Sequence, residues 1–161
     1  MRRNILILLC FVFLSLFCTV QSICAQKNLL SVVNKYIGEQ EDSIQASEPP
    51  KTRKVIQADL DGDGDKDAVV KYMLEGFGGG NNWAQMLAVF RNDKGVYKFV
   101  TEDSIGGKLL EKSFTLKKVV NRKIYLDILF CPEISQGICE NPKKGRAAFV
   151  FRKGKLQKLQ I

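Results

Sequence analysis

Residues 59–67 read DLDGDGDKD, and this stretch decides how the rest of the chain is interpreted. An aspartate occupies every second position, and two glycines lie between the aspartates. Two carboxylates held about 4 Å apart near a protein surface repel one another by roughly 4 kcal/mol. A compact form of this segment therefore requires a bound cation.

The spacing of these aspartates is that of an oxygen-rich metal loop. In the D-x-D-x-D-G pattern, side-chain and backbone oxygens at alternate positions surround Ca²⁺. The expected ligands are the side chains of Asp59, Asp61 and Asp63, the backbone carbonyl of Asp65, and the carboxylate of Asp67. We therefore predict a Ca²⁺ site formed by these five residues.

The segments on either side of the loop are short, apolar and rich in β-branched residues. Residues 54–58 (KVIQA) and 68–73 (AVVKYM) are typical of β-strands. A helix-loop-helix calcium site would carry a bidentate glutamate at the position that Val70 occupies. The sequence thus predicts a hairpin of two strands joined by the metal loop.

With its flanks, the loop reads ADLDGDGDKDAVV, which resembles the calcium hairpins of the FG-GAP and VCBS repeat families. A repeat propeller needs several blades, whereas the motif occurs once in this chain. The pieces GFGGG, MLAVFRNDKG, FCPEISQ and RKGKLQKL are in turn similar to a loosely defined group of small exported bacterial β-domain proteins. These resemblances imply a calcium hairpin, a β fold and export, and they imply no particular catalytic activity.

Two other interpretations of the loop remain open. The residues VIQADLDGD are also similar to the first motif of haloacid dehalogenase-type phosphatases, where the first aspartate, here Asp59, is the nucleophile. Asp63 replaces the threonine of that motif, and too little chain follows for a doubly wound parallel sheet. The other interpretation is a polar turn that binds nothing, because Asp and Gly are ordinary turn residues.

The first 25 residues have the pattern of a secretory signal peptide. Arg2 and Arg3 precede an apolar run from residue 5 to residue 20, and the small residue Ala25 ends the segment. This predicts export to the periplasm or the extracellular space, with the mature chain starting at Gln26. Lipid anchoring through a cysteine of this segment is the alternative.

Cleavage after Ala25 would leave two cysteines, Cys131 and Cys139. An even pair in an exported protein predicts one disulfide bond. The chain contains no histidine, and the spacing of the two cysteines matches no zinc pattern.

Turn residues divide the rest of the chain into short segments. Residues 26–38 carry apolar side chains at helical spacing and predict one short helix that ends at Gly38, followed by a polar linker to residue 52. Residues 53–161 predict about eight strands, and residues 123–131 alternate at period two. We expect a mainly β domain, an antiparallel meander that forms a partial barrel or a sandwich.

The formal net charge of +8 allows an anionic partner. The lysines and arginines are spread over predicted strands and turns, which favours a solvated surface and argues against nucleic acid. Without histidine, Ser-His-Asp and Cys-His catalysis are excluded. We predict a non-enzymatic binding module that Ca²⁺ stabilises, with a protein or glycan partner at the cell envelope and no transmembrane span. A periplasmic inhibitor or immunity-type protein and a metal-dependent phosphoester hydrolase are the alternatives.

Overall fold

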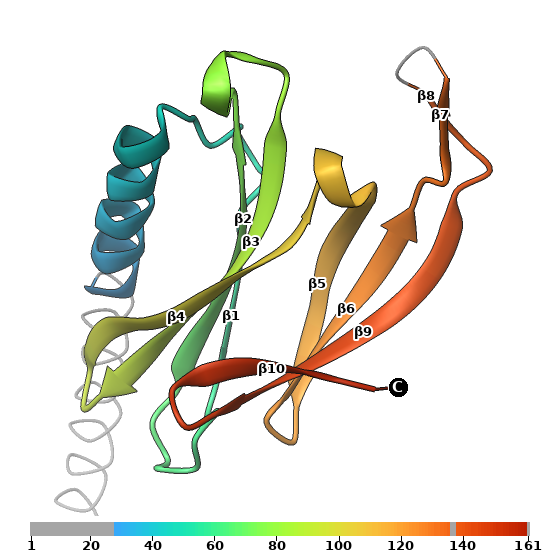
Figure 1. The fold of residues 1–161 in the computed structure, drawn as a ribbon. Helices are drawn as coiled ribbons and strands as arrows, with labels where there is room; N and C mark the ends of the chain where they lie inside the picture. The colour runs from blue at the N-terminus through green and yellow to red at the C-terminus, as the bar shows by residue number, and fades with distance from the viewer. Residues whose placement is uncertain (1–27, 136–137, 161) are drawn as a thin grey trace, which may run out of the picture.

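The computed structural model of the protein describes residues 28–135 and 138–160. The expected signal peptide, residues 1–25, lies outside the described residues. Within them, no helix is long and apolar enough to cross a membrane. The described chain consists of one helix and a large antiparallel sheet (Figure 1).

The helix spans residues 28–44, so the prediction that it ends at Gly38 was wrong. A glycine inside a helix costs only about 0.5–1 kcal/mol relative to alanine. That cost is offset because Leu29, Val33 and Ile37 are buried against the sheet. Beyond the helix, the backbone carbonyl of Glu41 accepts a hydrogen bond from the amide of Ala46. The polar segment after residue 38 therefore continues the helix before it becomes a linker.

In the described residues, eight strands form one antiparallel sheet, which confirms the predicted fold class, and their order is β1-β2-β3-β4-β5-β6-β9-β10. The strands are β1 (Lys54–Ala58), β2 (Asp67–Glu75), β3 (Trp83–Asp93), β4 (Val96–Gly107), β5 (Lys112–Val120), β6 (Lys123–Phe130), β9 (Lys143–Arg152) and β10 (Lys155–Leu159). Short 3-10 turns, η1 (Phe77–Gly79) and η2 (Lys108–Leu110), follow β2 and β4. A small hairpin of β7 (Glu133–Ser135) and β8 (Ile138–Glu140) lies between β6 and β9 in the chain.

The sheet bends sharply between β4 and β5, where only Gly107 and Lys112 pair across the two strands. The first half of the sheet (β1 to β4) therefore folds over the second half (β5, β6, β9 and β10), and the sheet does not close into a barrel. Strand β1 lies against β5, and β10 lies against β4. Figure 1 shows the two halves facing one another.

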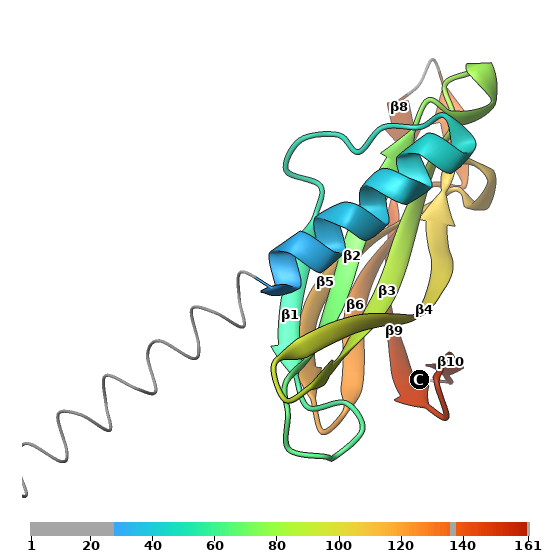
Figure 2. The same ribbon diagram turned by 90° about the vertical axis from the view of Figure 1, so that its left-hand side faces the viewer.

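Two hydrophobic cores result from this arrangement. The inner core lies between the halves and contains Leu60, Val69, Leu87, Val89, Ile105, Phe114, Leu116, Ile124, Leu126, Ala147, Phe149, Phe151 and Leu156. The helix-side core contains Leu29, Val33, Ile37, Ala68, Val70, Tyr72, Leu74, Ala88, Phe90 and Tyr97. The helix covers the outer face of the first half (Figure 2). Strand β2 is buried on both faces, because Val69 belongs to the inner core and Val70 to the helix-side core.

Candidate metal centre

The aspartate loop joins β1 to β2 at one end of the first hairpin. Gly62 and Gly64 have φ angles of 93° and 95°, a left-handed conformation that glycine adopts without steric cost. The carboxylate of Asp59 accepts hydrogen bonds from the backbone amides of these two glycines, at 2.5 Å from Gly62 and 3.3 Å from Gly64. The loop therefore wraps around the side chain of its first residue.

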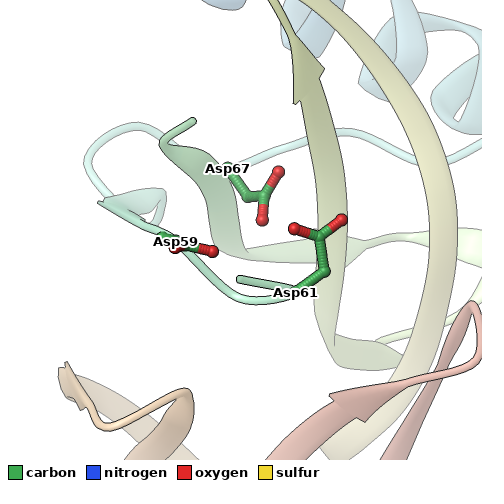
Figure 3. A group of neighbouring side chains, drawn as sticks. All are labelled: Asp59, Asp61 and Asp67. Atoms are coloured by element: carbon green, nitrogen blue, oxygen red, sulfur yellow. The ribbon is translucent and has the colours of Figure 1, made fainter. Parts of the chain in front are cut away.

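Of the four carboxylates predicted as ligands, three come together. Carboxylate oxygens of Asp59, Asp61 and Asp67 all lie within 4.8 Å of one another. In Figure 3 the three side chains point toward a common space beside the loop. Asp59 is half-buried, Asp61 is exposed and Asp67 is fully buried at the start of β2. The group therefore joins the exposed loop to the rigid sheet.

Asp67 is the anchor of this group. Its carboxylate accepts hydrogen bonds from the amide of Leu60 (3.0 Å) and from the amide of Asn92 on β3 (2.9 Å). Burial raises the pKa of the Asp67 carboxyl, and these two hydrogen bonds only partly offset that effect. The nearby carboxylate of Asp61 raises the pKa further. A bound cation would oppose both effects, because it stabilises the ionised form.

The side chains of Asp63 and Asp65 do not belong to this group of three. The Asp63 carboxylate accepts a hydrogen bond from the amide of Asp65 (2.9 Å). The Asp65 carboxylate accepts one from the amide of Lys94, in the β3–β4 turn (2.9 Å). These two aspartates shape the loop and attach it to the neighbouring hairpin.

Other residues that support the loop were not singled out from the sequence. The Tyr97 hydroxyl donates a hydrogen bond to the carbonyl of Lys66 (2.9 Å), and the side chain of Asn92 accepts one from Gly95 (2.8 Å). Only the turn pattern NDKG signals Asn92 in the sequence. The guanidinium of Arg122 lies against Gly62 and donates to the carbonyl of Asp61 at 3.5 Å. No local pattern predicts this contact, because Arg122 is in the β5–β6 turn of the other half.

Chemically, the group suits a hard divalent cation. Carboxylate and carbonyl oxygens are the ligands that Ca²⁺, Mg²⁺ and Mn²⁺ prefer. The clustered residues fit such an ion, because three carboxylates this close repel one another unless a positive charge lies between them. Asp59, Asp61 and Asp67 would hold the ion. The ion would neutralise the three carboxylates and link the loop to strand β2.

The second predicted feature, the disulfide, is present. Cys131 and Cys139 are bonded, with their Cα atoms 5.5 Å apart. The bond joins the residue after β6 to the middle of β8 and closes the β7–β8 hairpin. Because both sulfurs are bonded, neither cysteine is available as a nucleophile.

Comparison with protein-family models, with curated proteins and with solved structures finds no match for this chain.

Proposed function

We propose that this protein is an exported, non-enzymatic binding module whose fold is stabilised by Ca²⁺ bound at Asp59, Asp61 and Asp67. The observation that carries the proposal is the convergence of three carboxylates, one of them buried in the sheet. The pattern of the first 25 residues supports export to the periplasm or the extracellular space, with a lipid anchor as the alternative.

Calcium is the favoured ion because its coordination geometry is less demanding than that of Mg²⁺. Ca²⁺ accepts six to eight oxygen ligands in irregular arrangements, whereas Mg²⁺ requires a near-ideal octahedron. Three carboxylates leave room for backbone carbonyls and water to complete the shell. The same loop carries two glycines in left-handed conformation, which allow its backbone to adjust to the ion.

The cation would act on the fold as a cross-link. It would join the loop to β2 through Asp67, whose carboxylate also contacts the amide of Asn92 on β3. At a free Ca²⁺ concentration about 100 times the dissociation constant, binding would stabilise the folded state by about 2.7 kcal/mol. The stabilised sheet would then present its surfaces to a protein or glycan partner.

Calorimetric titration of the purified chain with CaCl₂ and, separately, with MgCl₂ tests this proposal. We expect Ca²⁺ to bind more tightly than Mg²⁺ and to raise the melting temperature relative to EDTA. Asp61→Asn should weaken Ca²⁺ binding at least about tenfold, since ligand charge sets the affinity of such loops. This variant should still fold, because Asp61 is exposed and its removal relieves repulsion.

Asp63→Asn and Asp42→Asn are the matched comparisons. Asp63 is in the loop but outside the group of three, so its loss should weaken binding less than the loss of Asp61. Asp42 is exposed on the helix and should have no effect. A wild-type chain that melts identically in EDTA and in millimolar Ca²⁺, with no heat of binding, would exclude the proposal.

A further inference from the structure

A basic hollow of about 1130 Å³ lies on the second half of the sheet, over β5, β6 and β9. We call it the basic hollow and define it by six of its lining residues. These are Lys117, Lys118, Tyr125, Asp127, Lys144 and Arg146. The four cations form two pairs that are distant in the sequence, one on β5 and one on β9, and strand pairing through β6 brings the two pairs to one surface.

A β-bulge on β5 places two adjacent lysines in the hollow. Leu116 pairs with Leu126, but the next pair is Lys118 with Tyr125, so Lys117 is an extra residue. Leu116 and Val119 both face the inner core. Between them, a regular strand would turn one of the two lysines inward, whereas the bulge allows both to face outward.

Regular alternation supplies the remaining residues. On β6, Leu126 faces the inner core, so its neighbours Tyr125 and Asp127 face outward. On β9, Ala147 faces the same core, and Arg146 pairs directly with Asp127. Lys144 lies two residues before Arg146 and therefore shares its face of the sheet.

The polar groups in the hollow are only partly neutralised. Lys117 pairs with Asp127 at 3.1 Å, and their side chains remain 52% and 49% exposed. Lys118 extends over the ring of Tyr125, with its Nζ atom 5.7 Å from the ring centre. Four cations with one carboxylate leave a surplus of positive charge on a concave, solvent-accessible surface.

We propose that the basic hollow binds an acidic polysaccharide, with uronic acid carboxylates paired to Lys144, Arg146 and Lys118. This inference rests on the proposed role as a binding module, but it does not depend on the cation at the aspartate loop. It assigns the surface and the ligand class that the proposed function leaves open.

Three features favour a glycan over other anionic partners. The volume exceeds the roughly 300–1,000 Å³ of pockets for small ligands, which suits an oligomer. Asp127 offers an acceptor for the hydroxyls of a glycan, which the backbone of DNA lacks. A concave surface does not match the flat headgroup layer of a membrane.

The test measures binding of a hyaluronan octasaccharide to the full chain by calorimetry, with a neutral dextran oligosaccharide as the control ligand. Lys144→Gln combined with Arg146→Gln should weaken binding about 2- to 30-fold, the range expected for two exposed ion pairs. Lys54→Gln combined with Lys98→Gln removes the same charge from exposed sites on the first half and should change binding less than about twofold. Higher salt should weaken binding.

Comparing Asp127→Asn with Asp127→Ala separates a glycan from a general attraction of anions. Both variants remove the same charge, but only asparagine keeps an oxygen that accepts hydrogen bonds from sugar hydroxyls, so octasaccharide binding should be weaker in Asp127→Ala than in Asp127→Asn. Equal binding by these two variants, or a loss of binding that is equal in the two double variants, would overturn the proposal. Tighter binding to single-stranded DNA or to phosphatidylglycerol vesicles than to the octasaccharide would also overturn it.

Running each titration in Ca²⁺ and in EDTA distinguishes this inference from the proposed metal site. Octasaccharide binding without any Ca²⁺ binding would support glycan binding at the basic hollow and contradict the proposed metal site. Ca²⁺ binding without octasaccharide binding would contradict glycan binding at the basic hollow and leave the proposed metal site standing.

Discussion

The carboxylate of Asp67 lies 2.9 Å from the backbone nitrogen of Asn92, and this hydrogen bond attaches the aspartate loop to the third strand. Asp67 is fully buried. The same side chain accepts a hydrogen bond from Leu60, which is in the loop itself. One carboxylate therefore connects the loop, β2 and β3, whether or not an ion is bound.

Replacing Asp67 with alanine should destabilise the fold. Two buried backbone amides, those of Leu60 and Asn92, would lose their acceptor. An unsatisfied buried donor costs about 1–3 kcal/mol, so we expect Asp67→Ala to lower the free energy of unfolding by at least this amount in EDTA. Urea denaturation measures the change. Asp42→Ala, on the exposed face of the helix, should stay within about 0.5 kcal/mol of wild type, and equal effects of the two variants would contradict the expectation.

Arg122→Gln should increase the stabilisation that Ca²⁺ confers. The Arg122 guanidinium lies beside Gly62 and donates to the Asp61 carbonyl, so its charge attracts the aspartates of the metal-free loop. A bound cation neutralises the loop and makes that attraction unnecessary. We expect a loss of about 0.2–1 kcal/mol in EDTA and a smaller loss in Ca²⁺. Thermal melts under both conditions measure this difference, and Arg91→Gln, an exposed change on β3, is the control. A larger loss in Ca²⁺ than in EDTA would show that the argument is wrong.

Glu102 should make stability depend on pH. Burial raises the pKa of its carboxyl from the ordinary value of 4.5, although the hydrogen bond from the Tyr72 hydroxyl opposes the shift. The folded chain then keeps a proton that the unfolded chain has lost. The stability contributed by Glu102 is therefore greatest below pH 4.5 and falls as the pH rises through the raised pKa.

In Glu102→Gln the side chain has no charge at any pH, and its amide oxygen can still accept from Tyr72. The free energy of unfolding of this variant relative to wild type should therefore increase between pH 4 and pH 7, in urea titrations with EDTA present. Asp103→Asn, an exposed change on the same strand, should show a smaller dependence. A constant or decreasing difference for Glu102→Gln would exclude this role.

Gly107 should be intolerant of a side chain at the bend of the sheet. A Cβ atom there would lie 2.7 Å from the carbonyl oxygen of Trp83, and the φ angle is 152°. We expect Gly107→Ala to destabilise the fold by about 1–3 kcal/mol, because the neighbouring backbone would have to move. Gly38→Ala is the matched change. It lies inside the helix with nothing within 4 Å, and it should stabilise by about 0.5–1 kcal/mol.

Much of the fold follows from local patterns in the chain. The alternation at Ile124, Leu126 and Ile128 predicts a strand with one apolar face, and turn residues separate it from its neighbours. Because short apolar segments separated by turn residues favour antiparallel strands, the approximate number of main strands and their antiparallel arrangement could be predicted, whereas their order in the sheet could not. The end of the helix could not, since tertiary packing outweighed the low helix propensity of Gly38.

The candidate site, too, could be predicted only in part from the sequence. Five aspartates at alternate positions predicted a metal loop, because the pattern of charges and glycines is local. Which three carboxylates meet is a matter of tertiary structure, since it depends on Asp67 being held by an amide of β3 and on Asp65 being drawn toward Lys94. These partners lie more than twenty residues away in the chain.

The sequence by itself determined a mainly β protein with an acidic loop and one disulfide, because alternation, turn residues and cysteine pairing are properties of short segments or of composition. Only the tertiary structure decided where the sheet bends and that the lysines of β5 line one hollow with Lys144 and Arg146 of β9. The physical reason is that strand pairing and a single β-bulge set which side chains share a face, and neither is encoded in the spacing of charges along the chain.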